Sequence, residues 1–151
     1  MKADKLAELG FGAAEMMFRE SGEVLGMVVL HADNKVFAMP YKNCRPDEVD
    51  QQRLLIICTV KAARKEGVFE GMVMLSEAWV AEQKNPALMG VLRPALDPDR
   101  KEILLVHAYG DDGKSIMVTA DILRKDGKAE VGPRKELECD VKCWLDAAFN
   151  D

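Results

Sequence analysis

The sequence lacks the short motifs that identify the common catalytic and nucleotide-binding proteins. It contains no G-x-G-x-x-G stretch, no phosphate-binding lysine loop, no G-x-S-x-G turn and no H-E-x-x-H pair. These absences argue against dinucleotide-binding enzymes, P-loop nucleotidases, serine hydrolases and zinc metalloproteases. We therefore expect a protein that needs no cofactor.

Cysteine is also scarce, because four cysteines in 151 residues are too few for a disulfide scaffold. Cys139 and Cys143 are spaced for one helix face, where Cβ atoms stand about 5–6 Å apart, whereas a disulfide needs roughly 3.5–4.5 Å. Their spacing is not that of a zinc motif either. We therefore expect all four thiols to be reduced and metal-free.

Two alternatives for the cysteines stay open. One is a zinc site completed by further thiol and imidazole groups, namely Cys44, Cys58, His31 and His107. The other is a reactive thiol at Cys143, if a helix begins at Asp140 and its dipole lowers the pKa of that thiol.

Long hydrophobic runs are absent as well. The densest ones, 24–30 and 54–58, are far shorter than the roughly 20 residues that cross a bilayer. The first residues form a helical pattern that includes Glu8 and Glu15, which is not the pattern of a secretion signal. These features favour a soluble, cytoplasmic protein with no membrane contact.

The overall composition is that of a single domain, 1–151, with 48% hydrophobic and 31% charged residues. Its net charge of −5 argues against general binding to nucleic acid. One basic cluster lacks the interleaved aromatic residues that stack on bases, and we interpret it as a solvated hairpin tip. Its members are Arg124, Lys125, Lys128, Arg134 and Lys135.

Hydrophobic periodicity predicts three helices. The first spans 4–20, with Asp4 as its cap, and its expected core side is Leu6, Leu9, Phe11, Ala13, Met16 and Phe18. The second spans 47–65 and ends at Gly67. Its apolar run 54–58 covers the whole circumference at 100° per residue, so we expect this helix to be buried on more than one side. The third is an amphipathic closing helix that carries Val141, Trp144, Leu145 and Ala148.

The strands are expected in a mainly antiparallel arrangement. A hairpin joins 24–31 to 36–39 through Asp33 and Asn34, which tolerate positive φ. Further strands are predicted at 72–81, 102–109, 115–123 and 128–131. Because Met72 to Ala81 carries apolar residues on both faces, we expect it to be a central strand.

The fold class that follows is α+β, a single mainly antiparallel sheet of five to six strands with three helices on one face. The order is α-β-β-α-β-β-β(-β)-α. In its sequence of elements alone, this order resembles the roadblock and profilin-like α/β sandwiches, and such a likeness does not imply a function.

The segment 83–101 is the first candidate site, because a connection of this length between two strands is unusual in a compact domain. It contains the apolar stretch 88–92, with Leu88 and Leu92. We interpret it as a flap over a pocket or an arm that binds a partner. The alternative is a loop folded back onto its own core.

Polar residues within apolar strands form the second candidate site. Strand alternation places Glu77 with Trp79 on one face, and His107 with Ile103 and Leu105 on another strand. With Arg100, they are candidates for an acid–base or anion-binding group. The alternatives are structural histidines and a solvated turn at 97–102.

Two functions are carried forward. The first is a noncatalytic binding or assembly module that acts through the 83–101 loop. The second is a small enzyme or small-molecule binder with a pocket under that loop, using Glu77, Arg100 and His107. We also expect a homodimer or larger homo-oligomer, with another protein as a further possible partner, because the runs 54–58 and 88–92 are more apolar than a solvated surface. The alternative is that the first and last helices shield the second.

Overall fold

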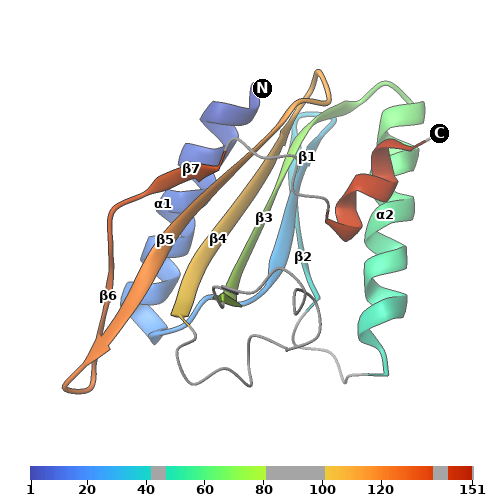
Figure 1. Ribbon diagram of the computed structural model, residues 1–151. Coiled ribbons are helices and arrows are strands. Elements are labelled where there is room, and N and C mark those ends of the chain that lie inside the picture. The colour runs from blue at the N-terminus through green and yellow to red at the C-terminus, as the bar shows by residue number, and fades with distance from the viewer. Residues whose placement is uncertain (42–46, 81–100, 138–142, 151) are drawn as a thin grey trace, which may run out of the picture.

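In the computed structural model, one antiparallel sheet lies between helices on both of its faces (Figure 1). The structure describes residues 1–41, 47–80, 101–137 and 143–150, except the side chains of residues 79, 80 and 137. The elements are α1 (Ala3–Ser21), β1 (Met27–Ala32), β2 (Lys35–Pro40), α2 (Val49–Lys65), β3 (Phe69–Val80), β4 (Lys101–Gly110), β5 (Ser115–Lys125), β6 (Lys128–Val131), β7 (Lys135–Leu137) and the 3₁₀ helix η3 (Trp144–Phe149). The α+β class and the order of the elements are therefore confirmed, with β7 as one additional short strand.

The sheet has the strand order β2-β1-β3-β4-β5-β6, and β7 also pairs with β5. Each pair of neighbours is antiparallel. β3 lies between β1 and β4, which confirms the central position predicted for it. Val73 and Leu75 of β3 belong to one apolar cluster, and Met72 and Met74 belong to another on the opposite face.

Tight turns join the hairpins, and the first turn lies at the residues expected to form it. Asp33 and Asn34 have φ of 53° and 57°, the left-handed conformation of both central residues in a type I′ turn. The turn between β5 and β6 repeats this pattern at Asp126 and Gly127. Both hairpins are therefore specified by local turn chemistry.

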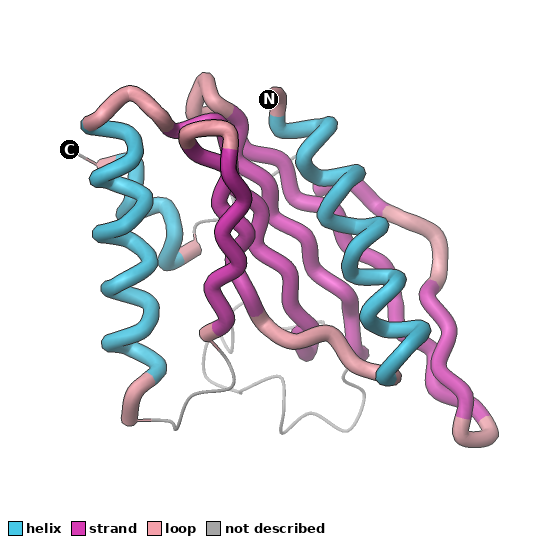
Figure 2. Tube along the Cα trace, turned by 180° about the vertical axis from the view of Figure 1, so that it is seen from behind, coloured by secondary structure: helices cyan, strands magenta, loops and turns pink. Residues whose placement is uncertain are grey.

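The helices lie on both faces of the sheet, so the predicted one-face arrangement is wrong (Figure 2). α1 packs against β3, β4 and β5 in the first apolar cluster. α2 and η3 pack on the opposite face in the second cluster. The physical reason is that the central strands carry apolar side chains on both faces, and each face needs its own cover.

The buried side of α1 also differs from the predicted one. Leu9 and Met16 are 54% and 59% exposed, and Ala13 is exposed. Leu6, Phe11 and Phe18 are buried as predicted, and the other residues that face the sheet are Ala7, Gly10 and Ala14. The small residues on this side let the helix approach the sheet closely. Lys2 is the N-cap and Asp4 lies in the first turn, so Asp4 is not the cap.

α2 ends as predicted, with Gly67 in the left-handed conformation at φ 73°. The Gly67 N–H donates to the Arg64 carbonyl and the Val68 N–H donates to the Ala63 carbonyl. These two bonds form a Schellman motif, which favours glycine at the first position after the cap. Among the described residues, no helix is both long and apolar enough to span a membrane.

Candidate association surface

The outer side of α2 is the largest departure from the expected burial. Only Ile56, Val60 and Ala63 of this helix are buried. Leu54 and Leu55 are 61% and 60% exposed. The prediction that the 54–58 run is buried on more than one side is therefore wrong within one chain. The reason is that α1 covers the opposite face of the sheet and does not shield α2.

The exposed residues of α2 form one continuous stripe, which we call the α2 outer face. On a helix with 3.6 residues per turn, the stripe lies opposite Ile56 and Val60. Its exposed members are Asp50, Gln51, Leu54, Leu55, Cys58, Thr59, Lys61, Ala62 and Lys65. The centre of the stripe is apolar, its first turn is acidic and its last turn is basic.

The edge strand β2 also carries exposed apolar residues, of which Phe37 pairs with Leu30 and so lies on the α2 face of the sheet. Val36 and Phe37 are both exposed large hydrophobic residues. The Gln52 side-chain amide donates to the Pro40 carbonyl at 3.1 Å, which ties α2 to the end of β2. Figure 2 shows the β1–β2 hairpin in front, between α1 and α2.

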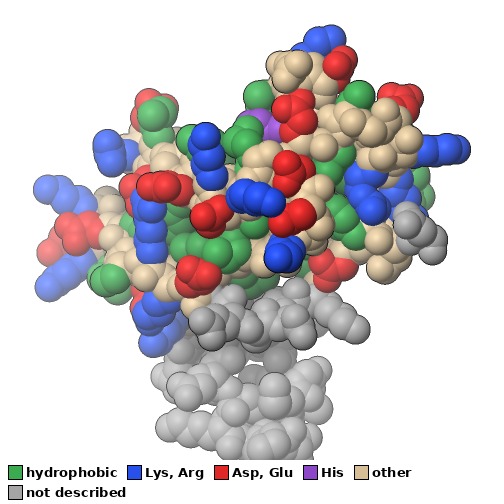
Figure 3. Space-filling model, turned by 90° about the horizontal axis from the view of Figure 1, so that it is seen from above, with side chains coloured by type: hydrophobic (Ala, Val, Ile, Leu, Met, Phe, Trp, Pro, Cys, Tyr) green, Lys and Arg blue, Asp and Glu red, His purple; other side chains and the backbone are tan. Residues whose placement is uncertain are grey.

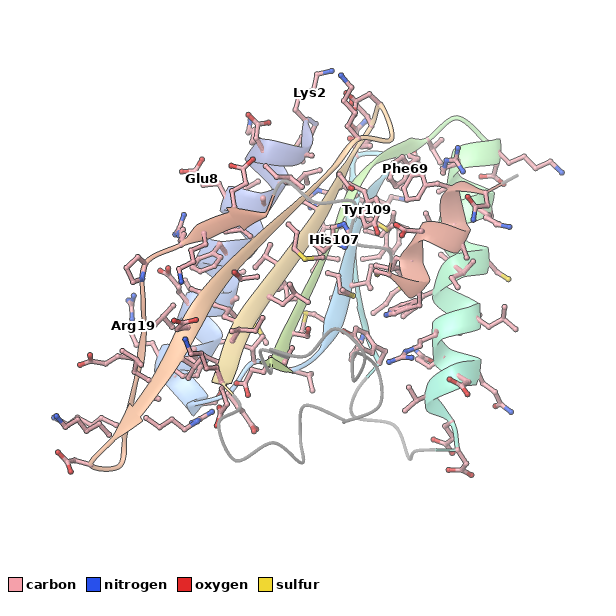
Figure 4. All side chains as sticks on the ribbon, viewed as in Figure 1. Lys2, Glu8, Arg19, Phe69, His107 and Tyr109 are labelled. Atoms are coloured by element: carbon pink, nitrogen blue, oxygen red, sulfur yellow. The ribbon has the colours of Figure 1, made fainter. Side chains whose placement is uncertain are left out.

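A buried polar cluster lies on the α2 side of the sheet, beneath η3 (Figure 4). The Tyr109 hydroxyl donates to Asp146 Oδ1 at 2.7 Å and lies 3.4 Å from His107 Nδ1. The Cys143 backbone N–H donates to the other Asp146 oxygen at 2.8 Å. Burial and the hydrogen bond to Asp146 raise the pKa of Tyr109. These hydrogen bonds hold η3 against β4, so we assign the cluster a structural role.

Cys143 is the N-cap of η3, and its sulfur accepts a hydrogen bond from the Leu145 N–H at 3.3 Å. Burial raises the pKa of the Cys143 thiol, which is the opposite of the shift considered for a reactive thiol. Position 140, where that alternative placed the helix start, lies outside the described residues. Within the described ranges, no group of three or more side chains is arranged to hold a metal ion.

His107 gives the fold a predicted dependence on pH. Burial lowers the pKa of His107, whereas the unfolded chain binds a proton near pH 6.5. The unfolded state therefore binds more protons below that pH, and the free energy of unfolding falls as the pH drops below about 6.5. Urea unfolding at pH 7.5, 6.0 and 5.0 measures this decline.

We expect His107→Phe to weaken the decline, since the variant cannot take up the proton. His31→Gln is the matched control. Burial also lowers the pKa of His31, but that side chain is only partly buried, so we expect this variant to change the decline less. An unchanged decline in the His107 variant would show that other groups cause it.

Glu77 and His107 lie on opposite faces of the sheet. Glu77 pairs with Leu104 of the first apolar cluster, on the α1 side. His107 pairs with Met74 of the second cluster, on the α2 side. Glu77 Oε1 accepts a hydrogen bond from the Val24 N–H at 2.8 Å, and its carboxylate is 3.7 Å from Arg124. The structure therefore does not bring these two candidate residues together.

The remaining predicted site residues are described only in part. The Trp79 backbone pairs with Glu102, and its side chain lies outside the described part of the chain. Leu88, Leu92 and Arg100 lie in 81–100, which is also outside the described residues. The interpretation of the 83–101 loop therefore stays a prediction.

The basic hairpin borders a shallow groove of about 580 Å³ between the end of α1 and the β5–β6 turn. Arg124 is held there by Glu102, with Nε and Oε2 2.9 Å apart, and by the Phe18 ring, whose centroid is 5.6 Å away. Asp126 and Glu130 lie among the cations of the groove. On the face shown in Figure 3, acidic and basic side chains are likewise interspersed. This mixture is typical of a solvated surface.

Sequence reasoning did not single out Tyr109 and Asp146. Strand alternation places Tyr109 on the same face as His107, so the sequence could have indicated that Tyr109 lies beside His107. Asp146 had none, because its carboxylate meets Tyr109 through a contact between distant segments.

The comparisons with known proteins give one result. A sequence model of the family described as Bacteriophage lambda protein ea47 matches residues 1–147. No curated protein and no solved structure matches the chain. Because the family match spans nearly the whole sequence, the chain belongs to the bacteriophage lambda ea47 family.

Proposed function

We propose that this protein is a noncatalytic binding and assembly module that associates with a second copy of itself through the α2 outer face. The observation that carries the proposal is the exposure of Leu54 and Leu55, each about three-fifths open to solvent on adjacent positions of one helix. Soluble monomers seldom leave contiguous apolar surface in water. A twofold contact between identical surfaces is the commonest way to cover it.

The energetic gain comes from four leucine side chains, two from each chain. Burial of apolar surface contributes about 25 cal/mol per Å². Ordering of side chains and loss of free motion consume much of this gain. We therefore expect an association that depends on protein concentration.

Two parts of the proposal rest on the sequence. The 83–101 segment is proposed as a further contact with the second copy of the chain or with another protein, because Leu88 and Leu92 make it apolar. The cytoplasm is proposed as its compartment, because only four cysteines are present and none is spaced as a disulfide motif.

The test is the mass in solution. Light scattering behind size exclusion is expected to give about twice 16.8 kDa for the natural protein at high loading concentration. The double variant Leu54→Glu, Leu55→Glu is expected to run at 16.8 kDa, since a charge within the contact cannot be buried without a partner.

The matched control is Leu9→Glu, Met16→Glu on the outer side of α1, where the exposure is similar. We expect this variant to keep the doubled mass. A natural protein of single mass at every loading would rule out the proposal, and a control that dissociates equally would move the contact away from α2. Circular dichroism checks that each variant folds.

A further inference from the structure

We infer that the two copies pair through an antiparallel α2–α2 contact centred between Ile57 and Cys58, an inference that rests on the proposed association. The juxtaposition behind it is the arrangement of charge along the α2 outer face. Asp50 lies before the apolar centre, and Lys61 and Lys65 lie after it. Arrangement of the charges, rather than the apolar residues, selects the orientation.

In an antiparallel pair, each residue faces the residue that lies equally far on the other side of the centre. With the centre between Ile57 and Cys58, Asp50 of one copy faces Lys65 of the second, and this contact occurs twice by symmetry. Leu54 faces Lys61 of the second copy, and the two Cys58 residues lie side by side. Asp50, Leu54, Cys58, Lys61 and Lys65 are all exposed in one chain. Opposite charges therefore meet at both ends, and between them Leu54 packs against the alkyl stem of Lys61.

A parallel pair gives the opposite result. Its twofold axis runs along the helices, so every residue faces its own copy. Asp50 would face Asp50, and Lys61 and Lys65 would each face themselves. Like charges at close range oppose association, so the parallel orientation is disfavoured at each charged position of the stripe.

The charges are available for this contact. Asp50, Lys61 and Lys65 are exposed, and the part of the chain that the structure describes gives them no ion-pair partner. Arg64, the other cation of the last turn, is already engaged. Its guanidinium donates to the Ala148 carbonyl at 2.8 Å and lies 4.8 Å from the centroid of the Phe149 ring.

The centre of the stripe suits close packing of two helices. Cys58 and Ala62 are small, so the helix axes can approach to roughly 8–10 Å. Leu54 and Leu55 then pack beside the small residues of the second copy. A contact along one helix of 17 residues covers less than a standard interface, which agrees with the expected dependence on concentration.

Cross-linking of single-cysteine chains tests the orientation. The background carries Cys44→Ser, Cys139→Ser and Cys143→Ser, which leaves Cys58 alone. Two further chains carry Cys58→Ser in that background with either Gln51→Cys or Lys65→Cys. A short bismaleimide is added at a concentration where light scattering shows the dimer, and mass spectrometry identifies the products.

We expect the Cys58 chain to cross-link to itself. The chains with cysteine at 51 or 65 are expected not to cross-link alone, because like positions then stand roughly 20 Å apart at 1.5 Å per residue. Mixed together, they are expected to form a product that contains one of each. Asp50→Lys is expected to raise the dissociation constant several-fold, and Asp50→Lys with Lys65→Asp is expected to restore it.

Self-linking at positions 51 and 65 would show a parallel pair and overturn the inference while the association stands. A dimer by light scattering with no linkage at Cys58 would overturn it too and place the contact elsewhere. A single mass by light scattering would remove the proposed association itself.

Discussion

Gly71→Ala is expected to lower the free energy of unfolding by about 3 kcal/mol, from backbone strain together with overpacking. Gly71 has φ of 146°, a conformation that residues with a side chain rarely adopt, beside a register shift between β1 and β3. An added Cβ would overlap Leu6 Cδ1 and stand 3.2 Å from the Tyr109 carbonyl oxygen. Relief of one conflict does not relieve the other.

Urea unfolding followed by circular dichroism measures this change. The matched control is Gly12→Ala in α1, where an added Cβ meets nothing within 4 Å. That variant is expected to gain about 0.5–1 kcal/mol, because alanine favours a helix more than glycine does. A Gly71 variant as stable as the natural protein would show that the chain around β3 relaxes without cost.

Leu145→Ala is expected to lower the free energy of unfolding by about 3 kcal/mol, within the range for a fully buried leucine. Leu145 has no exposed surface and anchors η3 in the α2 cluster. Its loss leaves a cavity under η3, and the hydrogen bond between Tyr109 and Asp146 is then a main remaining contact between η3 and the sheet. We expect η3 to detach from the sheet before the rest of the protein unfolds.

Tryptophan fluorescence follows this detachment, because Trp144 packs against Tyr41 with ring centroids 5.4 Å apart. An early red shift in the variant, ahead of the loss of helical signal, is the expected result. Leu123→Ala serves as the control, since Leu123 is exposed and its loss is expected to change stability by less than about 0.5 kcal/mol. Equal effects of the two substitutions would contradict the role given to Leu145.

The elements that could be predicted from the sequence are those specified by neighbouring residues. Asp33 and Asn34 predict a tight hairpin because few other residues adopt positive φ at two successive positions. Gly67 marks the end of α2 for the same reason. The central position of β3 followed from apolar residues on both of its faces.

The features that were predicted wrongly depend on contacts between distant segments. Leu9 and Met16 are more hydrophobic than Gly10 and Ala14, yet Gly10 and Ala14 face the sheet because close approach favours small side chains there. The placement of helices on both faces depends on which helix packs on which face of β3 and β4. The hydrophobic periodicity of a single helix does not contain that information. The prediction that the run 54–58 is buried was wrong because hydrophobicity alone does not say whether residues of the same chain pack against it.

The pairing of β1 has a consequence for the order of folding. β1 pairs with β2, which follows it directly, but its other neighbour β3 is made only after the whole of α2. α1 likewise packs on β3, β4 and β5, all of which come later in the chain. Neither apolar cluster can be completed while the ribosome has released only α1 to α2. Such non-local closure is slow, and a nascent chain at this stage exposes apolar residues that favour aggregation.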